Sequence, residues 1–258
     1  MHTSGIAGEA LAMKPFRNPW ATKLRQFTEL DEEDVGILDR LVAEPESFEA
    51  DTDVFTEGQK VDWVNVVVEG MLCRYTVLEN GRRQITAFLV PGDMCDLHGF
   101  LLKEMDHSIA ALTLSRVAKI PRQVVMEITD RRPNLTRALW WSTLVDEAVL
   151  RQWIVNVGRR TAYERSAHLI WELYLRMMVV GETAQLSFRL PLTQQELADT
   201  LGMSIVHINR TLQRLRNEKV FTLANGHVTI HDPERLQGIA GFNPSYLHFY
   251  EHIGVRGR

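Results

Sequence analysis

The chain has 258 residues, of which 45% are apolar, and a formal net charge of −4. This length suits one large domain or two smaller ones. The net charge excludes a protein that attracts nucleic acid with its whole surface, so any such contact needs a local basic patch. No apolar run approaches the roughly 20 residues that span a bilayer. The N-terminus lacks the pattern of a signal peptide, and we therefore expect a cytoplasmic protein with no membrane partner.

Residues 1–22 are rich in Gly, Ala and Pro without periodicity, which predicts a flexible tail, and Met13 is an alternative start. From Phe48 to about Ile128, short segments rich in Val, Ile, Thr and Phe alternate with turn signals. One of these signals, Asn80-Gly81, lies between two alternating segments and predicts a hairpin. The pattern predicts a small antiparallel barrel or roll.

A long helix is predicted from Pro133, which is favoured in a first helical turn, to residue 158. Two apolar lines run along it, the second through Trp140, Leu144 and Ile154. One line suffices to cover the roll, so two indicate that the helix also packs against its twin in a homodimer. The alternative is a helix buried wholly in its own domain. We assign the dimer contact to the first line, which consists of Leu135, Ala138, Trp141, Val145, Ala148, Gln152 and Val155.

The segment LPLTQQELADTLGMSIVHINRTLQRLRNEKVF predicts a helix-turn-helix. Thr193 and Glu196 have the spacing of a capping box, so a short helix starts there. Gly202 permits a tight turn, and Ser204 can cap a second helix. The inner side of that second helix is predicted to be a buried stripe of Ile205, Ile208, Leu212 and Leu215.

The outer side of the second helix carries side chains that suit base edges in the DNA major groove. An arginine fork matches guanine, an asparagine amide can pair with adenine, and a valine methyl suits the thymine methyl. We predict base contacts for Val206, Asn209, Arg210 and Gln213. We predict phosphate contacts for Thr193, Ser204, His207, Arg214, Arg216 and Lys219. The alternative is a solvated amphipathic helix whose arginines merely keep it soluble.

The segment VFTLANGHVTI follows and predicts a hairpin with Asn225-Gly226 at its tip, which is the wing of a winged helix. We expect the wing to touch phosphate and His227 to be an idle surface residue. The predicted domains are a flexible tail (1–22), a sensor-like β-roll (23–132), a long dimerisation helix (133–158) and a winged helix-turn-helix DNA-binding domain (159–258).

From about residue 25 to 230, the chain resembles the Crp/Fnr family of bacterial transcription regulators. The roll with its PGD turn, the long helix and LTQQELADTLGMSIVHINRTLQRL carry this resemblance. It implies an α+β fold with an N-terminal cyclic-nucleotide-binding-like antiparallel β-roll and a C-terminal winged helix-turn-helix. It also implies a homodimer that binds palindromic promoter sites in double-stranded DNA, with RNA polymerase as a further partner.

The chain departs from the family pattern where the cyclic-nucleotide binders hold ribose and phosphate, with Gly-Glu-Leu and Arg-Ser/Thr-Ala segments. Counted from the PGD turn, the Gly-Glu pair falls on Asp96-Leu97 and the Arg-Ser-Ala segment on His107-Ser108-Ile109. Leucine cannot accept the ribose hydroxyl bond, His107 lacks the bidentate fork that suits a cyclic phosphate, and Asp96 has the wrong charge. We predict a degenerate ligand pocket at Asp96, Leu97, His107 and Ser108 that binds no cyclic AMP.

We expect no cofactor and no metal. The oxygen-sensing branch of the family holds an iron–sulfur cluster with four cysteines, mostly near the N-terminus, where this chain has none. Haem needs axial ligands, and the candidates are His98 and His107, although a lone loop histidine is more often structural. Cys73 and Cys95 could form a redox pair only if their strands are neighbours; isolated buried thiols are the commoner outcome.

The family commonly has a glutamate at the position of Val206, where it contacts a base and braces the arginine that matches Arg210. Valine does neither, so we expect an altered half-site. Two other functions remain open. A cupin metalloenzyme would use the roll, but it needs several converging histidines and a glutamate. A protein-binding scaffold would keep the fold without DNA. We favour a transcription regulator that is not an enzyme, with any effector acting on a hinge near Gly158.

Overall fold

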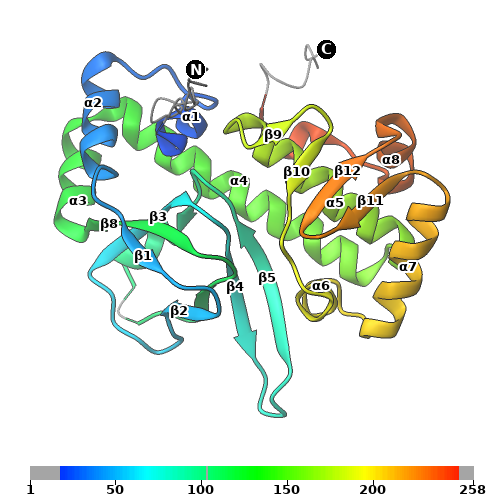
Figure 1. Ribbon diagram of the computed structural model, residues 1–258. Helices are drawn as coiled ribbons and strands as arrows, with labels where there is room; N and C mark the ends of the chain where they lie inside the picture. The colour runs from blue at the N-terminus through cyan, green and yellow to red at the C-terminus, as the bar shows by residue number, and fades with distance from the viewer. Residues whose placement is uncertain (1–17, 103, 250–258) are drawn as a thin grey trace, which may run out of the picture.

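The computed structural model describes residues 18–102 and 104–249, apart from the side chains of His98 and Phe100. The first half of this chain forms a β-roll, and the last third forms a group of helices beside a small sheet (Figure 1). One long helix crosses both parts. The fold class is α+β, which confirms the prediction from the sequence.

The prediction of a flexible tail over residues 1–22 is wrong for residues 18–22, which are ordered. Helix α1 (Pro19–Leu24) begins where the Asn18 side chain accepts hydrogen bonds from backbone N–H groups of the first turn. Trp20 is only 3% exposed, because α1 packs its apolar side into the core. The rest of the predicted tail, including the alternative start, lies outside the described residues. A second helix, α2 (Glu32–Leu41), follows.

Strands β1 to β8 form two four-stranded antiparallel sheets, with the orders β1-β8-β3-β6 and β2-β7-β4-β5. One apolar cluster fills the space between the sheets, and a larger one continues from their outer faces into the helices. The strands and the short 3₁₀ helix η1 have these bounds: β1 (Glu46–Phe48), β2 (Thr52–Phe55), β3 (Trp63–Glu69), β4 (Leu72–Val77), β5 (Arg83–Leu89), β6 (Met94–Cys95), η1 (Leu97–Phe100), β7 (Ser108–Ala111) and β8 (Ser115–Pro121).

The hairpin of β4 and β5 turns at Asn80-Gly81, as the sequence predicts, and Gly81 adopts a φ of +79° there. This hairpin extends from the roll past helix α6 (Gln194–Leu201) of the C-terminal part (Figure 1). It therefore brings roll residues next to the helix-turn-helix.

Helix α3 (Arg122–Arg131) leads into α4 (Pro133–Gly158), which runs along the whole molecule (Figure 1). The 26 residues of α4 span about 39 Å at 1.5 Å per residue. Pro133 occupies the first turn, where its missing N–H group has no intrahelical partner to lose.

Most of the first apolar line of α4 packs inside its own chain, which contradicts the assignment of its buried members to a dimer contact. Exposed fractions are 0% for Leu135 and Ala138, 4% for Val145 and 8% for Ala148. Trp141 stacks on Phe27 of the same chain, with the ring centroids 6.3 Å apart. The apolar surface of Leu135, Ala138, Val145 and Ala148 is already covered, so it cannot be buried again by a partner, whereas Trp141 keeps 37% of its surface exposed. Gln152 is half-buried, and Val155 is 42% exposed.

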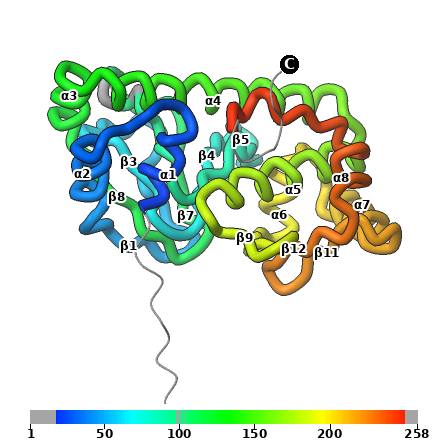
Figure 2. Tube along the Cα trace, turned by 90° about the horizontal axis from the view of Figure 1, so that it is seen from above, coloured from blue at the N-terminus to red at the C-terminus, as the bar shows by residue number. Residues whose placement is uncertain are grey.

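The second line, which we call the outer line, consists of Trp140, Leu144 and Ile154. Their exposed fractions are 73%, 58% and 64%. Figure 2 shows α4 along one edge of the molecule, with no other described element on its outer side. The sequence correctly predicts two apolar lines, but four of the seven residues that it assigns to a dimer contact are buried within the chain.

The C-terminal part has the order of a winged helix-turn-helix, and its small sheet has the strand order β11-β12-β10-β9. Its elements are α5 (Ala162–Val179), β9 (Thr183–Ala184), β10 (Ser187–Arg189), α6 (Gln194–Leu201), α7 (Ile205–Asn217), β11 (Phe221–Ala224), β12 (His227–Ile230), α8 (Pro233–Ala240) and the 3₁₀ helix η2 (Pro244–Leu247).

Both cysteines are buried free thiols that belong to different sheets, Cys73 in β4 and Cys95 in β6. Burial raises the pKa of Cys73 to about 12 and that of Cys95 well above its usual value. They are not a disulfide pair. None of the described helices has the length and hydropathy to cross a membrane.

Candidate DNA interface and ligand pocket

The first helix of the helix-turn-helix, α6, starts at a reciprocal cap. The Thr193 hydroxyl accepts from the Glu196 N–H at 3.1 Å and donates to Glu196 Oε2 at 2.8 Å. Glu196 Oε2 also accepts from the Thr193 N–H at 2.6 Å. This is the predicted capping box, and it fixes where α6 begins. Thr193 is exposed, but its hydroxyl is already used in the cap and is therefore a weak candidate for a phosphate contact.

The turn between α6 and α7 is shaped by Gly202, which has a φ of +59° at the C-cap of α6. Arg165 of α5 donates to the carbonyl oxygen of Leu201 at 2.7 Å and so satisfies one of the last carbonyls of the helix. Ser204 then caps α7, where its hydroxyl accepts from the His207 N–H at 3.3 Å. These local contacts set the angle at which α7 leaves the turn.

Helix α7 buries one face against the rest of the domain. Ile208 and Leu215 are fully buried, Thr211 is 6% exposed and Leu212 is half-buried. Ile205 was expected to extend this stripe, but it is 41% exposed. It stands in the first turn of α7, before the helix reaches its packing partners.

The four residues predicted to read bases share the opposite face of α7. Val206 is 60% exposed, Arg210 and Gln213 are exposed, and Asn209 is half-buried. Arg210 makes no hydrogen bond or ion pair with any residue that the structure describes, so its guanidinium is available to a ligand. It lines a groove of about 760 Å³ between α7 and the start of α5.

The basic residues at the end of α7 are held more firmly than the sequence indicates. Arg214 Nε donates to Glu218 Oε1 at 2.8 Å, and its guanidinium lies 4.0 Å from the ring centroid of Tyr163. The Tyr163 hydroxyl donates to Glu218 Oε2 at 2.6 Å. Burial and the hydrogen bond to Glu218 raise the pKa of Tyr163, which keeps the phenol protonated. Arg235 of α8 also pairs with Glu218.

Sequence reasoning missed Tyr163, Glu218 and Arg235. The spacing of Arg214 and Glu218, four residues apart on one helix, was a signal for part of this cluster. Of the other predicted phosphate contacts, Arg216 Nη2 donates to the Leu223 carbonyl oxygen of the wing at 3.2 Å. The exposed residues His207 and Lys219 lie at the two ends of α7.

The wing consists of β11 and β12, with Asn225-Gly226 at its turn. A cavity of about 350 Å³ separates the wing from α7, and Asn209, Gln213 and Arg216 line it together with Asn225. The wing tip and the exposed face of α7 therefore border the same space. The exposed His227 ring contacts the Asn225 carbonyl oxygen at 3.1 Å and makes no other hydrogen bond among the described residues.

The predicted ligand pocket is a cavity of about 230 Å³ between the roll and α4. Asp96, Leu97 and His107 line it, whereas Ser108 does not; the Ser108 hydroxyl accepts from the Glu57 N–H at 2.9 Å. The side chain of His98, a candidate haem ligand, lies outside the described part of the structure. Within that part, no group of three or more His, Cys, Asp or Glu residues could hold a metal ion.

Charged groups of the chain itself fill the polar end of this pocket. Asp96 Oδ1 accepts from Arg74 Nη2 at 2.9 Å, and Asp96 Oδ2 lies 2.7 Å from His107 Nε2. His107 Nδ1 lies 2.7 Å from Asp106 Oδ1, and Arg74 also pairs with Asp146 of α4 at 3.5 Å. Burial opposes protonation of His107, but its bonds to Asp96 and Asp106 outweigh this and raise its pKa.

Comparison with known proteins matches both halves of the chain. Residues 164–239 match the Crp-like helix-turn-helix domain, and residues 45–132 match the cyclic nucleotide-binding domain. Transcriptional activator protein FnrL of Cereibacter sphaeroides is 28% identical over 215 residues, which cover 82% of this chain and 86% of the relative. Nitrogen fixation regulation protein FixK of Bradyrhizobium diazoefficiens is 29% identical over 198 residues, covering 75% of this chain and 80% of the relative.

Solved structures share the fold. FixK2 from Bradyrhizobium japonicum has a TM-score of 0.70 at 23% identity, over 78% of this chain and 98% of that one. A CRP-family regulator from Thermus thermophilus has a TM-score of 0.61 at 18% identity, over 76% of this chain and 97% of that one. With both domains matched in this order, the chain belongs to the Crp/Fnr family of transcription regulators and carries a helix-turn-helix DNA-binding domain.

Proposed function

We propose that this protein is a homodimeric transcription regulator that binds palindromic promoter sites with the exposed face of α7. The observation that carries the proposal is the exposed guanidinium of Arg210, which pairs with no other described residue and is set between Val206 and Gln213 on a capped helix. Such a fork can take both acceptors of a guanine, O6 and N7. RNA polymerase would be the partner at the promoter, and the protein would have no enzymatic activity.

Arg210, Asn209, Gln213 and the methyl groups of Val206 would meet base edges. Ser204, His207, Arg216, Lys219 and the exposed edge of Thr193 would meet phosphates, with the outer nitrogens of Arg214. Tyr163 and Glu218 support this last contact, because they hold the Arg214 side chain but leave it exposed. Val206 offers no carboxylate to brace Arg210, so the half-site would differ from the one that the family commonly reads.

The outer line of α4 supports a homodimer. Three large apolar side chains, Trp140, Leu144 and Ile154, stand exposed on the face of the helix opposite its buried residues. Two copies paired along this face would bury them and place two α7 helices about 34 Å apart, one turn of DNA. Gln152 and Val155 lie beside the line and would join the contact, whereas the buried first-line residues would not.

The pocket supports a protein that binds no cyclic AMP. An anionic effector would have to displace the Asp96 carboxylate from Arg74 and His107, and it would then face Asp106, Asp146 and Glu147 at the cavity wall. Leu97 stands where the family's nucleotide binders supply a carboxylate to the ribose. The charged side chains of the pocket would therefore pair with one another and not with an effector.

The test is selection of double-stranded DNA from a random pool by the full chain, with affinities measured from about 50 to 200 mM salt. The expected result is an inverted repeat whose half-site centres are about ten base pairs apart, bound by a dimer with an affinity that falls steeply with salt. Failure to enrich any sequence would overturn the proposal. Calorimetric titration with cyclic AMP is expected to give no saturable heat, and micromolar saturable binding would overturn the account of the pocket.

A further inference from the structure

Four buried charges join the roll to the DNA-binding domain. The carboxylate of Asp93, in the turn between β5 and β6, pairs with Lys23 of α1 and accepts from Arg176 Nη2 of α5 at 2.6 Å. Arg176 also lies 3.5 Å from Glu172 Oε1, one turn earlier on α5. We call Lys23, Asp93, Glu172 and Arg176 the four-charge cluster. It holds two cations and two carboxylates, so its formal charge is zero.

Each member of the cluster is almost completely removed from solvent. Exposed fractions are 6% for Lys23, 1% for Asp93, 0% for Glu172 and 5% for Arg176. Separating the roll from α5 would leave Asp93 with Lys23 alone and would strand Arg176 beside Glu172. Because an unpaired buried charge is strongly unfavourable, any sliding of the domains that exposes only part of the cluster is opposed.

Further hydrogen bonds tie the cluster to every neighbouring element. Arg176 Nη2 donates to the Phe88 carbonyl oxygen of β5 at 2.7 Å, and the Val90 N–H donates to Asp93 Oδ2 at 2.9 Å. Glu172 Oε1 accepts from Trp153 Nε1 of α4 at 3.0 Å, and Glu172 Oε2 accepts from the Tyr246 hydroxyl of η2 at 2.6 Å. The roll, α4, α5 and the C-terminal segment therefore meet at one point.

The apolar surroundings are also shared between the domains. A single buried cluster contains Val66 and Phe88 of the roll, Trp153 of α4, and Leu173 and Val228 of the DNA-binding domain. The Phe88 and Trp153 rings meet edge to face, with centroids 5.7 Å apart. A continuous core of this kind is typical of one folding unit and not of two domains that touch.

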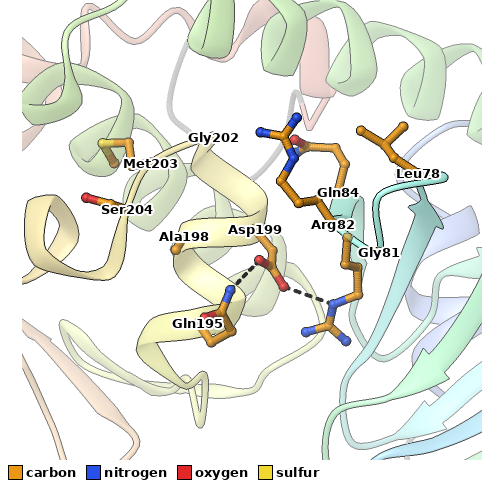
Figure 3. Close-up of a pocket in the computed structure, with 11 residues that line it drawn as sticks. Leu78, Gly81, Arg82, Gln84, Gln195, Ala198, Asp199, Gly202, Met203 and Ser204 are labelled. Carbon is orange, nitrogen blue, oxygen red and sulfur yellow. Dashed lines mark hydrogen bonds and ion pairs between the residues drawn. The ribbon is translucent and has the colours of Figure 1, made fainter.

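A second contact between the roll and the DNA-binding domain joins the β4–β5 hairpin to α6. Arg83 of the β4–β5 hairpin donates to Asp199 of α6 at 3.0 Å, and Gln84 donates to the Thr200 carbonyl oxygen at 3.2 Å. Figure 3 shows Asp199 held between this hairpin and Gln195, beside an open cleft of about 890 Å³. The hairpin thus contacts α6 directly, at a point separate from the four-charge cluster.

We infer that the roll and the winged helix-turn-helix form one permanent body, held by the four-charge cluster, and that they do not rotate about the end of α4 near Gly158. The exposed face of α7 is then preset relative to the outer line of α4 within each copy. A signal would have to act on how two copies pair, not on the angle between the domains; this last step rests on the proposed homodimer.

The inference is tested by the distance between two spin labels within one chain, measured by double electron–electron resonance on the full-length protein. Glu49→Cys labels the roll, and Gln237→Cys labels α8; both positions are exposed, whereas the native thiols are buried. Dilution with an excess of unlabelled protein isolates the distance within one chain. We expect one narrow distribution, with the same mean when the selected DNA is added. Two populations in the free protein, or a shifted mean on DNA, would overturn the inference.

Arg176→Met removes the central cation and is expected to broaden the distribution or add a longer distance. Arg189→Met removes an exposed arginine of the same domain and is expected to change nothing. A single unchanged distance in Arg176→Met would show that the cluster does not hold the domains. Asp199→Ala removes the Arg83 contact of the hairpin, together with the Gln195 contact within α6, and is expected to keep the narrow distribution; a split there would assign the role to the hairpin instead.

The measurement in the otherwise unchanged protein decides the inference even if Arg176→Met does not fold. It is also independent of the proposed function. A protein that selects no DNA or stays monomeric still reports one distance or several, so failure of either proposal is recognised separately.

Discussion

The Nε2 atom of His107 lies 2.7 Å from Oδ2 of Asp96, inside the cavity between the roll and α4 that the sequence predicts to be a degenerate ligand pocket. The same carboxylate accepts from Arg74. Two cationic groups that could have faced a phosphate are thus turned onto an internal anion. The contact makes the roll dependent on the protonation of one imidazole, and this dependence can be measured.

His107 should make the protein less stable as the pH rises through neutrality. Its pKa is raised in the folded state, so it contributes stability that is fully present below its ordinary pKa, about 6.5, and that is lost as the pH rises through the folded value. Asp96 and Asp106 favour the imidazolium, while burial and Arg74 oppose it. Urea unfolding at pH 6 and pH 8 should show a smaller difference in His107→Gln than in the unchanged protein. An equal difference would contradict the assignment.

His168 should have the opposite effect. Burial, with the charge of Arg160, lowers the pKa of His168 to about 3, and the ring stacks on Tyr246 with centroids 6.2 Å apart. The unfolded chain therefore takes up a proton that the folded chain refuses, so stability should fall as the pH drops below about 6.5. His168→Gln should flatten this fall between pH 6.5 and 5, measured by thermal unfolding. The exposed residue His231, replaced in the same way, serves as the control.

Arg210→Ala should relax sequence preference at one base pair. We expect a loss of about 1–3 kcal/mol of discrimination at a guanine, measured by anisotropy with single-substituted operators. Lys219→Gln should instead weaken binding to every operator by a similar factor and reduce the salt slope by about 1. Uniform weakening in Arg210→Ala would mean that this guanidinium meets phosphate.

Ile154→Lys should separate the dimer without unfolding the chain, because the side chain is 64% exposed in one copy. Sedimentation velocity should give a monomer with unchanged circular dichroism, and DNA affinity should fall with it. Met126→Lys, on α3, is the matched control, since Met126 is a 46% exposed apolar residue away from the outer line. A dimeric Ile154→Lys protein would exclude pairing along this face.

Asp93→Asn should cost about 3–5 kcal/mol of unfolding free energy at pH 7, because Lys23 and Arg176 lose a buried counter-charge. Burial opposes ionisation of Asp93, yet these two cations hold its pKa below the usual value. Its contribution is therefore present above the ordinary aspartate pKa and is lost as the pH falls through the lower folded value. Urea unfolding at pH 7, and again at a pH well below the ordinary aspartate pKa, checks this: the difference between the variant and the unchanged protein should be large at pH 7 and shrink at the lower pH. The exposed Asp130→Asn variant should match the unchanged protein.

The helix-turn-helix could be predicted from sequence because its signals are local. The Thr193–Glu196 box, the left-handed Gly202 and the Ser204 cap all lie within a few residues of the turns that they define. The exposed face of α7 followed from helical periodicity, since the buried side was marked by Ile208 and Leu215.

The faces of α4 and the charged clusters could not be found in this way. Two apolar lines on one helix indicate that both faces of the helix are covered. Which line meets the roll depends on distant elements such as α1 and the Phe27 ring. Lys23, Asp93 and Arg176 are separated by about seventy or more positions, and no spacing rule links them. The sequence predicts a poor nucleotide site at Asp96 and His107, but it does not predict that these two side chains pair with each other.

The pairing of Asp96 with Arg74 and His107 limits which single substitutions the roll tolerates. Exchanging Asp96 alone leaves Arg74 with Asp146 and His107 with the exposed Asp106, and exchanging His107 alone leaves Asp96 with Arg74, so each single step toward an effector-binding roll first weakens the contacts that close this end of the roll. An anion-binding roll would need Asp96 and the side chains that pair with it, Arg74 and His107, to be replaced together. In a lineage that carries these three side chains, a new small-molecule input would arise more readily elsewhere on the molecule.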